Sequence, residues 1–390
     1  MQKNLYKNSY NLLQNDLKNK ILLLDGAMGT MIQQEKLTAS DFGGEKYEGC
    51  NDYLVLQRPD VIKNIHKKYL EAGSDIIETN SFGALDIVLK DYDLEDTVFE
   101  MNKKAAELVN EAIAEYRSEH PEVTRNLYVA GALGPSNKSI SVTGGVTFEE
   151  LINNYYTAVS GLMAGGVDLI LFETIQDTRN LKAAYLGLKK AMEENYTVPL
   201  MLSFTIESTG TTLAGQTADA FYYAVNHMNP FSVGLNCATG PEFMTQFLKT
   251  LNNISNTYIS VYPNAGLPNE DGEYEETPDT LSAKIEPFFQ NNYLNIVGGC
   301  CGTTPQHIQK IKEKSVNYSP RVIDENKDFN DVSGLIALET PKDRPIYVGE
   351  RTNVIGSRIF KNLIASEKFD EATEVARLQI KGRADVIDIC

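Results

Sequence analysis

The sequence predicts an α/β protein built on a closed (β/α)8 barrel of the TIM type. Eight apolar runs of strand length recur before residue 303, and segments with a helical spacing of apolar residues separate them. Continuous apolar strands that alternate with helices are typical of a parallel sheet covered by helices. Eight such units over roughly 310 residues match a barrel somewhat larger than the usual ~250. A doubly wound open sheet is the alternative fold.

Each predicted strand is bounded by small or polar residues, and the helical segments lie between strands. The predicted strands are ILLLDGAM (21–28), SDIIETNSF (74–82), LYVAGALGPS (127–136), DLILFETIQ (168–176), LMLSFTIES (200–208), FSVGLNCAT (231–239), YISVYPNAG (258–266) and LNIVGGCCG (294–302). The clearest predicted helices are PDVIKNIHKKYLEAG, FEELINNYYTAVSGLMAGG and TRNLKAAYLGLKKAMEE. Each helix therefore leads into the next strand, as a barrel requires.

Composition excludes several classes of partner. Lys and Arg total 36 against 53 Asp and Glu, a net charge of −17, so nucleic acid and anionic membrane surfaces are disfavoured. The polar N-terminal stretch lacks the apolar region of a signal peptide, and no run is long and apolar enough to span a bilayer. We expect a soluble, cytoplasmic protein. In that compartment an odd count of five cysteines argues against a disulfide framework.

Polar and thiol side chains interrupt the ends of several predicted strands. The active site of such a barrel lies at the carboxyl ends of its strands, and buried polar groups without a function there would cost stability. Their shared position therefore predicts one site. The candidate residues are Asp25, Glu78, Asn80, Glu173, Cys237, Asn264, Cys300 and Cys301.

Two adjacent cysteines, Cys300 and Cys301, stand between glycines in VGGCCGTTPQHI. Neighbouring side chains of a regular strand point to opposite faces, so both thiols can bind one ion only where the backbone leaves strand geometry. The flanking glycines permit this departure, and Thr304 followed by Pro305 predicts a helix start. Together with Cys237, the pair supplies three thiolates and an open fourth position, which is the pattern of a catalytic zinc site.

Other roles for these residues stay open at this point. A cysteine such as Cys237 in a parallel strand is more often a small buried hydrophobic residue. A disulfide between the adjacent cysteines would be strained and would need an oxidising compartment. Two carboxylates at one barrel mouth, Asp25 and Glu173, suit an ammonium group, although each could instead be a helix cap or an ion-pair partner. Glu78 could be structural.

Seven motifs resemble the homocysteine S-methyltransferase barrel, in particular that of the cobalamin-dependent methionine synthases. In chain order they are LLLDGAMGTMIQ, ETNSFGA, GALGPS, FETIQD, GLNCATGP, YPNAGLPN and GGCCGTTPQHI. The resemblance runs from about residue 20 to residue 320. It implies the same barrel fold and the transfer of a methyl group to homocysteine.

The resemblance also implies a role for each site residue. The three cysteines would bind zinc, with Asn264 as a weak fourth ligand that the homocysteine sulfur replaces. Asp25 and Glu173 would hold the amino group of the substrate. The backbone amides that would receive its carboxylate belong to Gly26, Ala27, Met28, Gly29 and Thr30.

A second signal follows a polar stretch that contains three prolines. The segment IYVGERTNVIGSRIF resembles the opening strand of a pterin-binding barrel, with Asn353 and, further on, Asp388 as candidate pterin contacts. We expect a homocysteine-binding barrel over residues 1–325, a linker over 326–345, and the truncated beginning of a second α/β barrel over 346–390.

The sequence thus predicts a zinc-dependent homocysteine S-methyltransferase of the methionine synthase type, acting in methionine biosynthesis. The resemblance implies methylcobalamin as the methyl donor, carried by another module or protein and recharged there from methyltetrahydrofolate. A betaine- or S-methylmethionine-dependent homocysteine methyltransferase is one alternative. A non-enzymatic zinc or thiol-redox protein is another.

Overall fold

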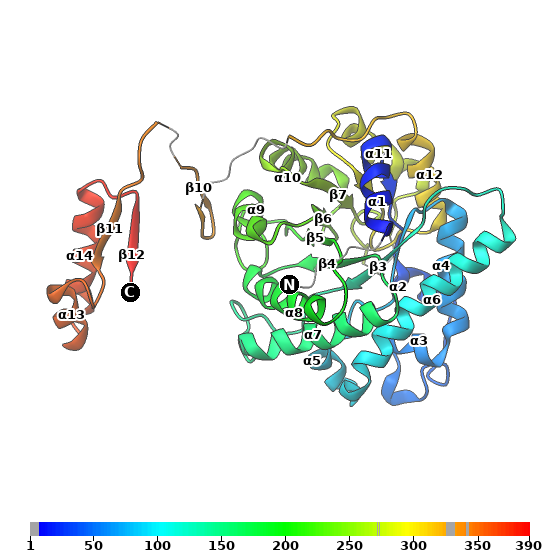
Figure 1. Ribbon diagram of the computed structural model, residues 1–390, viewed down its shortest axis with the longest axis horizontal. Coiled ribbons are helices and arrows are strands. Elements are labelled where there is room, and N and C mark those ends of the chain that lie inside the picture. The colour runs from blue at the N-terminus through cyan, green and yellow to red at the C-terminus, as the bar shows by residue number, and fades with distance from the viewer. Residues whose placement is uncertain (1–7, 271, 273, 325–331, 341–342) are drawn as a thin grey trace. The chain divides into compact units, whose positions relative to one another are not determined.

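The main part of the chain is a (β/α)8 barrel, as the sequence predicts (Figure 1). The computed structural model describes residues 8–270, 272, 274–324, 332–340 and 343–390. Eight parallel strands follow the order β1-β8-β7-β6-β5-β4-β3-β2, and a single bridge between Leu24 and Ile76 joins the two end strands. The strands are β1 (Leu22–Leu23), β2 (Ile76–Glu78), β3 (Tyr128–Leu133), β4 (Leu169–Ile175), β5 (Leu200–Phe204), β6 (Ser232–Asn236), β7 (Tyr258–Tyr262) and β8 (Ile296–Val297).

Helices surround the sheet and separate its strands along the chain (Figure 1). The start of α12 was predicted from the sequence: Thr304 and His307 form a capping box, and Pro305 occupies the first turn. No helix of the described residues is long and apolar enough to cross a membrane. The helices of this part are α1 (Asn8–Asn19), α2 (Met28–Gln34), α3 (Leu54–Gln57), α4 (Pro59–Ala72), α5 (Asp86–Leu89), α6 (Val98–Glu119), α7 (Phe148–Ala164), α8 (Thr178–Glu194), α9 (Ala218–Val225), α10 (Pro241–Ile254), α11 (Pro278–Gln290) and α12 (Pro305–Ser315).

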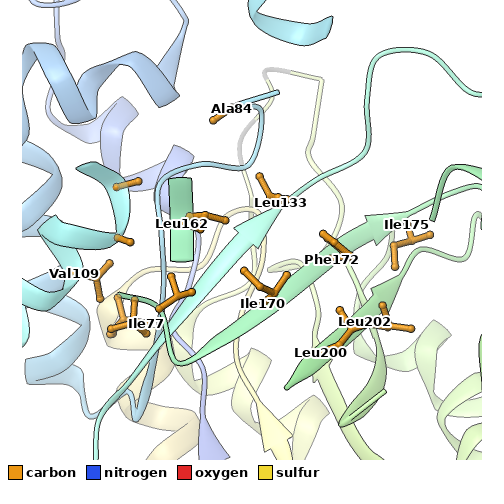
Figure 2. Close-up of a cluster of buried hydrophobic side chains, with 14 of the residues drawn as sticks. Ile77, Ala84, Val109, Leu133, Leu162, Ile170, Phe172, Ile175, Leu200 and Leu202 are labelled. Atoms are coloured by element: carbon orange, nitrogen blue, oxygen red, sulfur yellow. The ribbon is translucent and has the colours of Figure 1, made fainter. Parts of the chain in front are cut away.

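Side chains along the strands alternate between the barrel interior and the layer beneath the helices. In β1, Leu22 belongs to the interior cluster and Leu23 to the outer one. Figure 2 shows part of the outer layer, where Ile77 and Ile170 of the strands lie with Leu162 of α7. Because both faces of each strand are buried, the strands read as continuous apolar runs in the sequence.

Helix α1 was not predicted, because its sequence is mostly polar. Two of its side chains, Leu13 and Leu17, are nevertheless fully buried in the cluster that fills the barrel interior. Asp16 on the same helix accepts hydrogen bonds from the Tyr128 hydroxyl (2.7 Å) and the Asn126 amide (3.0 Å). The helix therefore covers the amino-terminal end of the barrel, opposite the end where the site was expected.

The chain divides into two compact units, and each is described by itself. One comprises Met1–Phe329 and Ser333–Ala337, and the other Asn330–Val332 and Leu338–Cys390. Much of the predicted linker lies outside the described residues, so its boundaries stay a prediction. The remaining elements are β9 (Val332–Ser333), β10 (Ala337–Leu338), β11 (Val348–Thr352), α13 (Arg358–Ala365), α14 (Phe369–Lys381) and β12 (Val386–Ile389).

The C-terminal unit contains a strand, β11, within the segment that resembles the opening strand of a pterin-binding barrel. Strands β11 and β12 pair in parallel, and α13 and α14 lie between them along the chain. Several large apolar side chains of this unit are exposed, among them Val348, Ile355 and Phe369. Whether the unit is the beginning of a second barrel stays a prediction.

Candidate functional site

Three cysteine thiols meet at the carboxyl end of the barrel. Cys237 follows β6, and Cys300 with Cys301 follows β8. The Sγ atom of Cys301 lies 3.8 Å from that of Cys237 and 4.0 Å from that of Cys300, and all three sulfur atoms lie within 4.8 Å of one another. The sequence-based expectation that these thiols come together is therefore met in space.

The backbone leaves strand geometry at both cysteine segments. Cys237 has a φ of 57°, in the left-handed region that residues with a side chain rarely adopt. After Cys301, Gly302 has a φ of 82°, which glycine adopts without strain. A side chain at Gly299 would lie 2.5 Å from the Thr303 hydroxyl, so that glycine allows the loop to fold back tightly.

The spacing of the three sulfurs fits a zinc ion. Zinc binds thiolates at ~2.3 Å in a tetrahedral arrangement, which places neighbouring sulfurs roughly 3.8 Å apart. The two measured separations, 3.8 and 4.0 Å, match this value. Three soft thiolate ligands also favour zinc over magnesium or calcium. The described residues therefore include three thiols that are placed to hold one metal ion.

The three thiols differ in their pKa values. Hydrogen bonds from Cys237 and Cys300 lower the pKa of the Cys301 thiol to about 3. The same hydrogen bonding, together with burial, raises the pKa of Cys300 well above its usual value. One negative charge is thus already favoured at Cys301, which is the state that a cation would bind.

Three carboxyl groups lie in the same part of the barrel. Asp25 follows β1, Glu78 ends β2, and Glu173 lies in β4. Asp25 is 2 % exposed and Glu173 is 6 % exposed. The Oδ2 atom of Asp25 accepts a hydrogen bond from the Glu78 amide (3.1 Å), whereas Asp25 Oδ1 and Glu78 Oε1 are buried without a partner. Unpartnered buried acceptors of this kind are suited to a cationic ligand.

Burial changes the ionisation of all three carboxyl groups. It raises the pKa of Glu173 to about 8, with the nearby Cys301 charge as a second cause. It also raises the pKa of Glu78 well above the usual range, and Glu173 and Asp25 add repulsion. Burial likewise outweighs the hydrogen bond to Asp25 and raises the pKa of that group. A positive charge placed among these groups would offset both the cost of burying the carboxylates and the repulsion between them.

The thiols and the carboxyl groups line one cavity of about 350 Å³. This volume is within the range of small-molecule sites. The segment Gly26–Thr30 contributes to the wall, and Thr30 Oγ1 accepts a hydrogen bond from the Gly302 amide (3.0 Å), which ties the first turn of α2 to the cysteine loop. The other predicted site residues that line the cavity are Asp25, Glu78, Asn80, Glu173, Cys237, Cys300 and Cys301.

The comparisons with known proteins agree with this geometry. The model of the homocysteine S-methyltransferase family matches residues 22–315. The chain belongs to that family. The barrel of this chain is similar to that of the homocysteine methyltransferase MmuM from Escherichia coli. The oxidized form is 24 % identical with a TM-score of 0.66, and the match covers 79 % of this chain and 100 % of that one. The metallated form is 25 % identical with a TM-score of 0.65, covering 78 % and 100 %.

Asn264 differs from the other predicted site residues. It follows β7 and is 4 % exposed, and its Oδ1 atom is buried without a hydrogen-bond partner. It is not among the residues that line the cavity. Its role as a weak fourth ligand therefore stays a prediction.

Of two further residues near the site, Tyr274 was not singled out by the sequence reasoning, and Glu78 was named there as a strand-end candidate without an assigned role. Glu78 was left as a structural candidate, but it lines the cavity with an unpartnered oxygen. Its signal was present, because it ends an apolar run as Asp25 and Glu173 do. Tyr274 packs its ring directly over Gly302. It comes from a long loop after β7, for which the sequence offers no periodic signal.

The predicted pterin contacts lie in the C-terminal unit, at the ends of two paired strands. Asn353 follows β11, and its Oδ1 atom accepts hydrogen bonds from the amides of Ile355 (2.8 Å) and Gly356 (3.0 Å). Asp388 lies exposed on β12. Asn353 thus stabilises a turn, and a pterin-binding role for either residue stays a prediction.

Proposed function

We propose that this protein transfers a methyl group to the thiol of homocysteine in a zinc-dependent reaction. The observation that carries the proposal is the presence of three convergent thiols and three buried carboxyl groups in one cavity. Membership of the homocysteine S-methyltransferase family supports the substrate. The metallated form of MmuM, a relative at 25 % identity, supports a metal.

Cys237, Cys300 and Cys301 would hold the zinc, and Asn264 would be a weak fourth ligand. Zinc bound there would supply a Lewis acid that favours the thiolate form of the homocysteine sulfur. The substrate thiol would release its proton to solvent and its sulfur would attack the methyl carbon. The bond between that carbon and the donor would break, and its electron pair would stay with the donor.

Asp25, Glu173 and the segment Gly26–Thr30 of the same cavity would bind the amino acid group of the substrate. Asp25 has an Oδ1 acceptor without a hydrogen-bond partner, and Glu173 lies near enough to Cys301 for the thiolate charge to raise its pKa. An ammonium group would donate hydrogen bonds to both carboxylates. The backbone of Gly26–Thr30 would receive the substrate carboxylate. These assignments place the binding groups for the amine and for the sulfur of one ligand in the same cavity.

We further propose methylcobalamin, carried by another module or protein, as the methyl donor. The support is the resemblance of the motifs to methionine synthases. Betaine and S-methylmethionine are the alternative donors, and a thiol-redox role without methyl transfer is the alternative function.

A comparison of methyl donors tests the proposal. Purified zinc-loaded protein is incubated with homocysteine and, separately, with methylcobalamin, methyltetrahydrofolate, betaine or S-methylmethionine, and methionine is measured. We expect methionine from methylcobalamin alone, and none after zinc is removed. Transfer from betaine or S-methylmethionine would refute the donor, whereas no transfer from any donor, with zinc bound, would refute the function.

A further inference from the structure

Strand β4 contains a bulge beside Glu173, near the carboxyl end of the strand. Phe172 pairs with Leu202, but the next pair joins Ile175 to Phe204, so β4 holds one extra residue. Thr174 lies at this point with a φ of 54°, which is rare for a β-branched residue. Such a conformation persists only where its surroundings hold it.

The bulge separates the residue that faces the cavity from the residues packed under the helices. Leu171 belongs to the interior cluster, and Glu173 follows it in phase and lines the cavity. Phe172 and Ile175 both pack in the outer cluster, although three positions separate them. In a regular strand Ile175 would share the face of Glu173, because neighbouring side chains alternate between the faces. The irregular backbone at Thr174 lets Ile175 pack in the outer cluster instead.

Asn236 holds this bulge with its side chain. Its Oδ1 atom accepts hydrogen bonds from the Thr174 amide (3.0 Å) and from the Ser203 hydroxyl (2.7 Å). Its Nδ2 atom donates to Thr174 Oγ1 (2.8 Å). The orientation of the amide is fixed, because a backbone N–H can only donate. Asn236 and Ser203 are both fully buried, so water does not compete for these bonds.

The contact joins the two ends of the proposed substrate site. Glu173 immediately precedes Thr174, and the zinc-site residue Cys237 immediately follows Asn236. The Asn236 side chain reaches across β5, which lies between β4 and β6 in the sheet. A single buried amide therefore fixes the segment that carries the amine-binding carboxylate relative to the segment that carries a thiol.

We propose that Asn236 is a positioning residue that sets the spacing between Glu173 and Cys237, and thereby selects homocysteine over cysteine. Cysteine carries the same charged groups but is one methylene shorter, so only the spacing between the amine and sulfur positions distinguishes the two. A site built for one length discriminates against the loss of a methylene by ~10- to 200-fold. The inference rests on the proposed function of the cavity, because it assigns the two ends to amine and sulfur.

The test compares Asn236→Ala with a matched control, Asn295→Ala. Asn295 is also fully buried, accepts from the Ile259 amide (3.0 Å) and donates to the Arg321 carbonyl (2.8 Å). It lies just before β8, at the amino end of the barrel, away from the cavity. The two substitutions therefore remove similar buried hydrogen bonds, but only Asn236→Ala releases the bulge.

Calorimetric titration of the zinc-loaded proteins with L-homocysteine and with L-cysteine gives the decisive ratio. We expect Asn236→Ala to weaken homocysteine binding roughly tenfold, the scale of one well-placed charged contact. Cysteine binding should change much less, so the preference falls. Asn295→Ala should lower the midpoint of thermal unfolding but leave the preference unchanged. Zinc content is measured for each protein, since all three thiols remain in every variant.

Two outcomes would overturn the proposal: an unchanged preference in folded, zinc-loaded Asn236→Ala, or an equal loss of preference in Asn295→Ala. If Asn236→Ala does not fold, Thr174→Gly tests the same contact, because glycine adopts the φ of 54° without strain and removes the hydroxyl acceptor. It too should lose preference for homocysteine. A wild-type protein that binds neither zinc nor homocysteine would instead refute the proposed function itself.

Discussion

The substitution Glu173→Gln separates a binding role from a structural one. The side chain keeps its shape and loses its negative charge. If Glu173 is a partner of the substrate ammonium group, homocysteine should bind more weakly while the three thiols still bind zinc. If it merely supports the fold, stability should fall instead. The structure favours the first outcome, because no ion-pair partner of Glu173 is found among the described residues and burial disfavours its ionised form.

The expected loss follows from the charge of the contact and from the pKa of Glu173. A hydrogen bond to a charged group contributes ~1.5 to 3 kcal/mol, equivalent to roughly 10- to 150-fold in affinity. The pKa of Glu173 is raised to about 8, so ionising it at pH 7 offsets part of this contribution, on the order of 1 kcal/mol. We therefore expect a loss near tenfold at pH 7 and a larger one at pH 8.5, where the carboxylate forms without that cost.

Calorimetric titration of zinc-loaded protein at both pH values measures this loss. The matched control is Asp177→Asn, in the loop after the same strand. Although burial raises its pKa, hydrogen bonds from Ser139 (2.6 Å), Ser141 (2.9 Å) and Arg179 (2.8 Å) lower it overall. Asp177→Asn should cost about 2 kcal/mol of unfolding free energy and leave homocysteine affinity unchanged. Unchanged affinity in Glu173→Gln, or a loss in both variants, would refute the reasoning.

Three further predictions concern the site. Glu78→Gln should raise the free energy of unfolding above pH 4.5 and leave it unchanged below that pH. Burial raises the folded-state pKa of Glu78, so the wild type loses stability as the pH rises. Urea denaturation at a series of pH values measures this difference. Gly299→Ala should destabilise the protein by ~1 to 3 kcal/mol and weaken zinc binding in a chelator competition, since the added methyl would lie 2.5 Å from the Thr303 hydroxyl. With zinc bound, only Cys390 should react rapidly with a thiol reagent. After chelation Cys301 should react as well, because its pKa is lowered to about 3, whereas the pKa values of Cys50 and Cys237 are raised to about 11.

Much of the fold could be predicted because the barrel strands are buried on both faces. Runs such as the one ending at Glu173 stand out without any alignment, and glycines around Cys300 signalled a departure from strand geometry. Helix α1 could not be predicted, since only Leu13 and Leu17 of its residues are apolar and buried. Its burial depends on the open end of the barrel, which no local pattern reveals.

The candidate site was predicted less completely than the fold. The thiols have a distinctive chemistry and spacing, whereas Glu78 differs from a structural carboxylate only in lacking a partner, which the folded chain alone reveals. The role of Asn236 depends on Thr174, 62 positions earlier, and on the strand between them. Hydrogen bonds across a sheet are set by register, so a single sequence does not predict them.

X-ray absorption spectroscopy at the zinc edge tests the central claim most directly. It counts the sulfur ligands of the bound metal in the protein alone and with homocysteine added. We predict three sulfurs and one lighter ligand in the protein alone, four sulfurs with homocysteine, and loss of the metal in Cys300→Ala. A zinc ion whose sulfur count does not rise when homocysteine binds, or one retained in full by Cys300→Ala, would contradict the account.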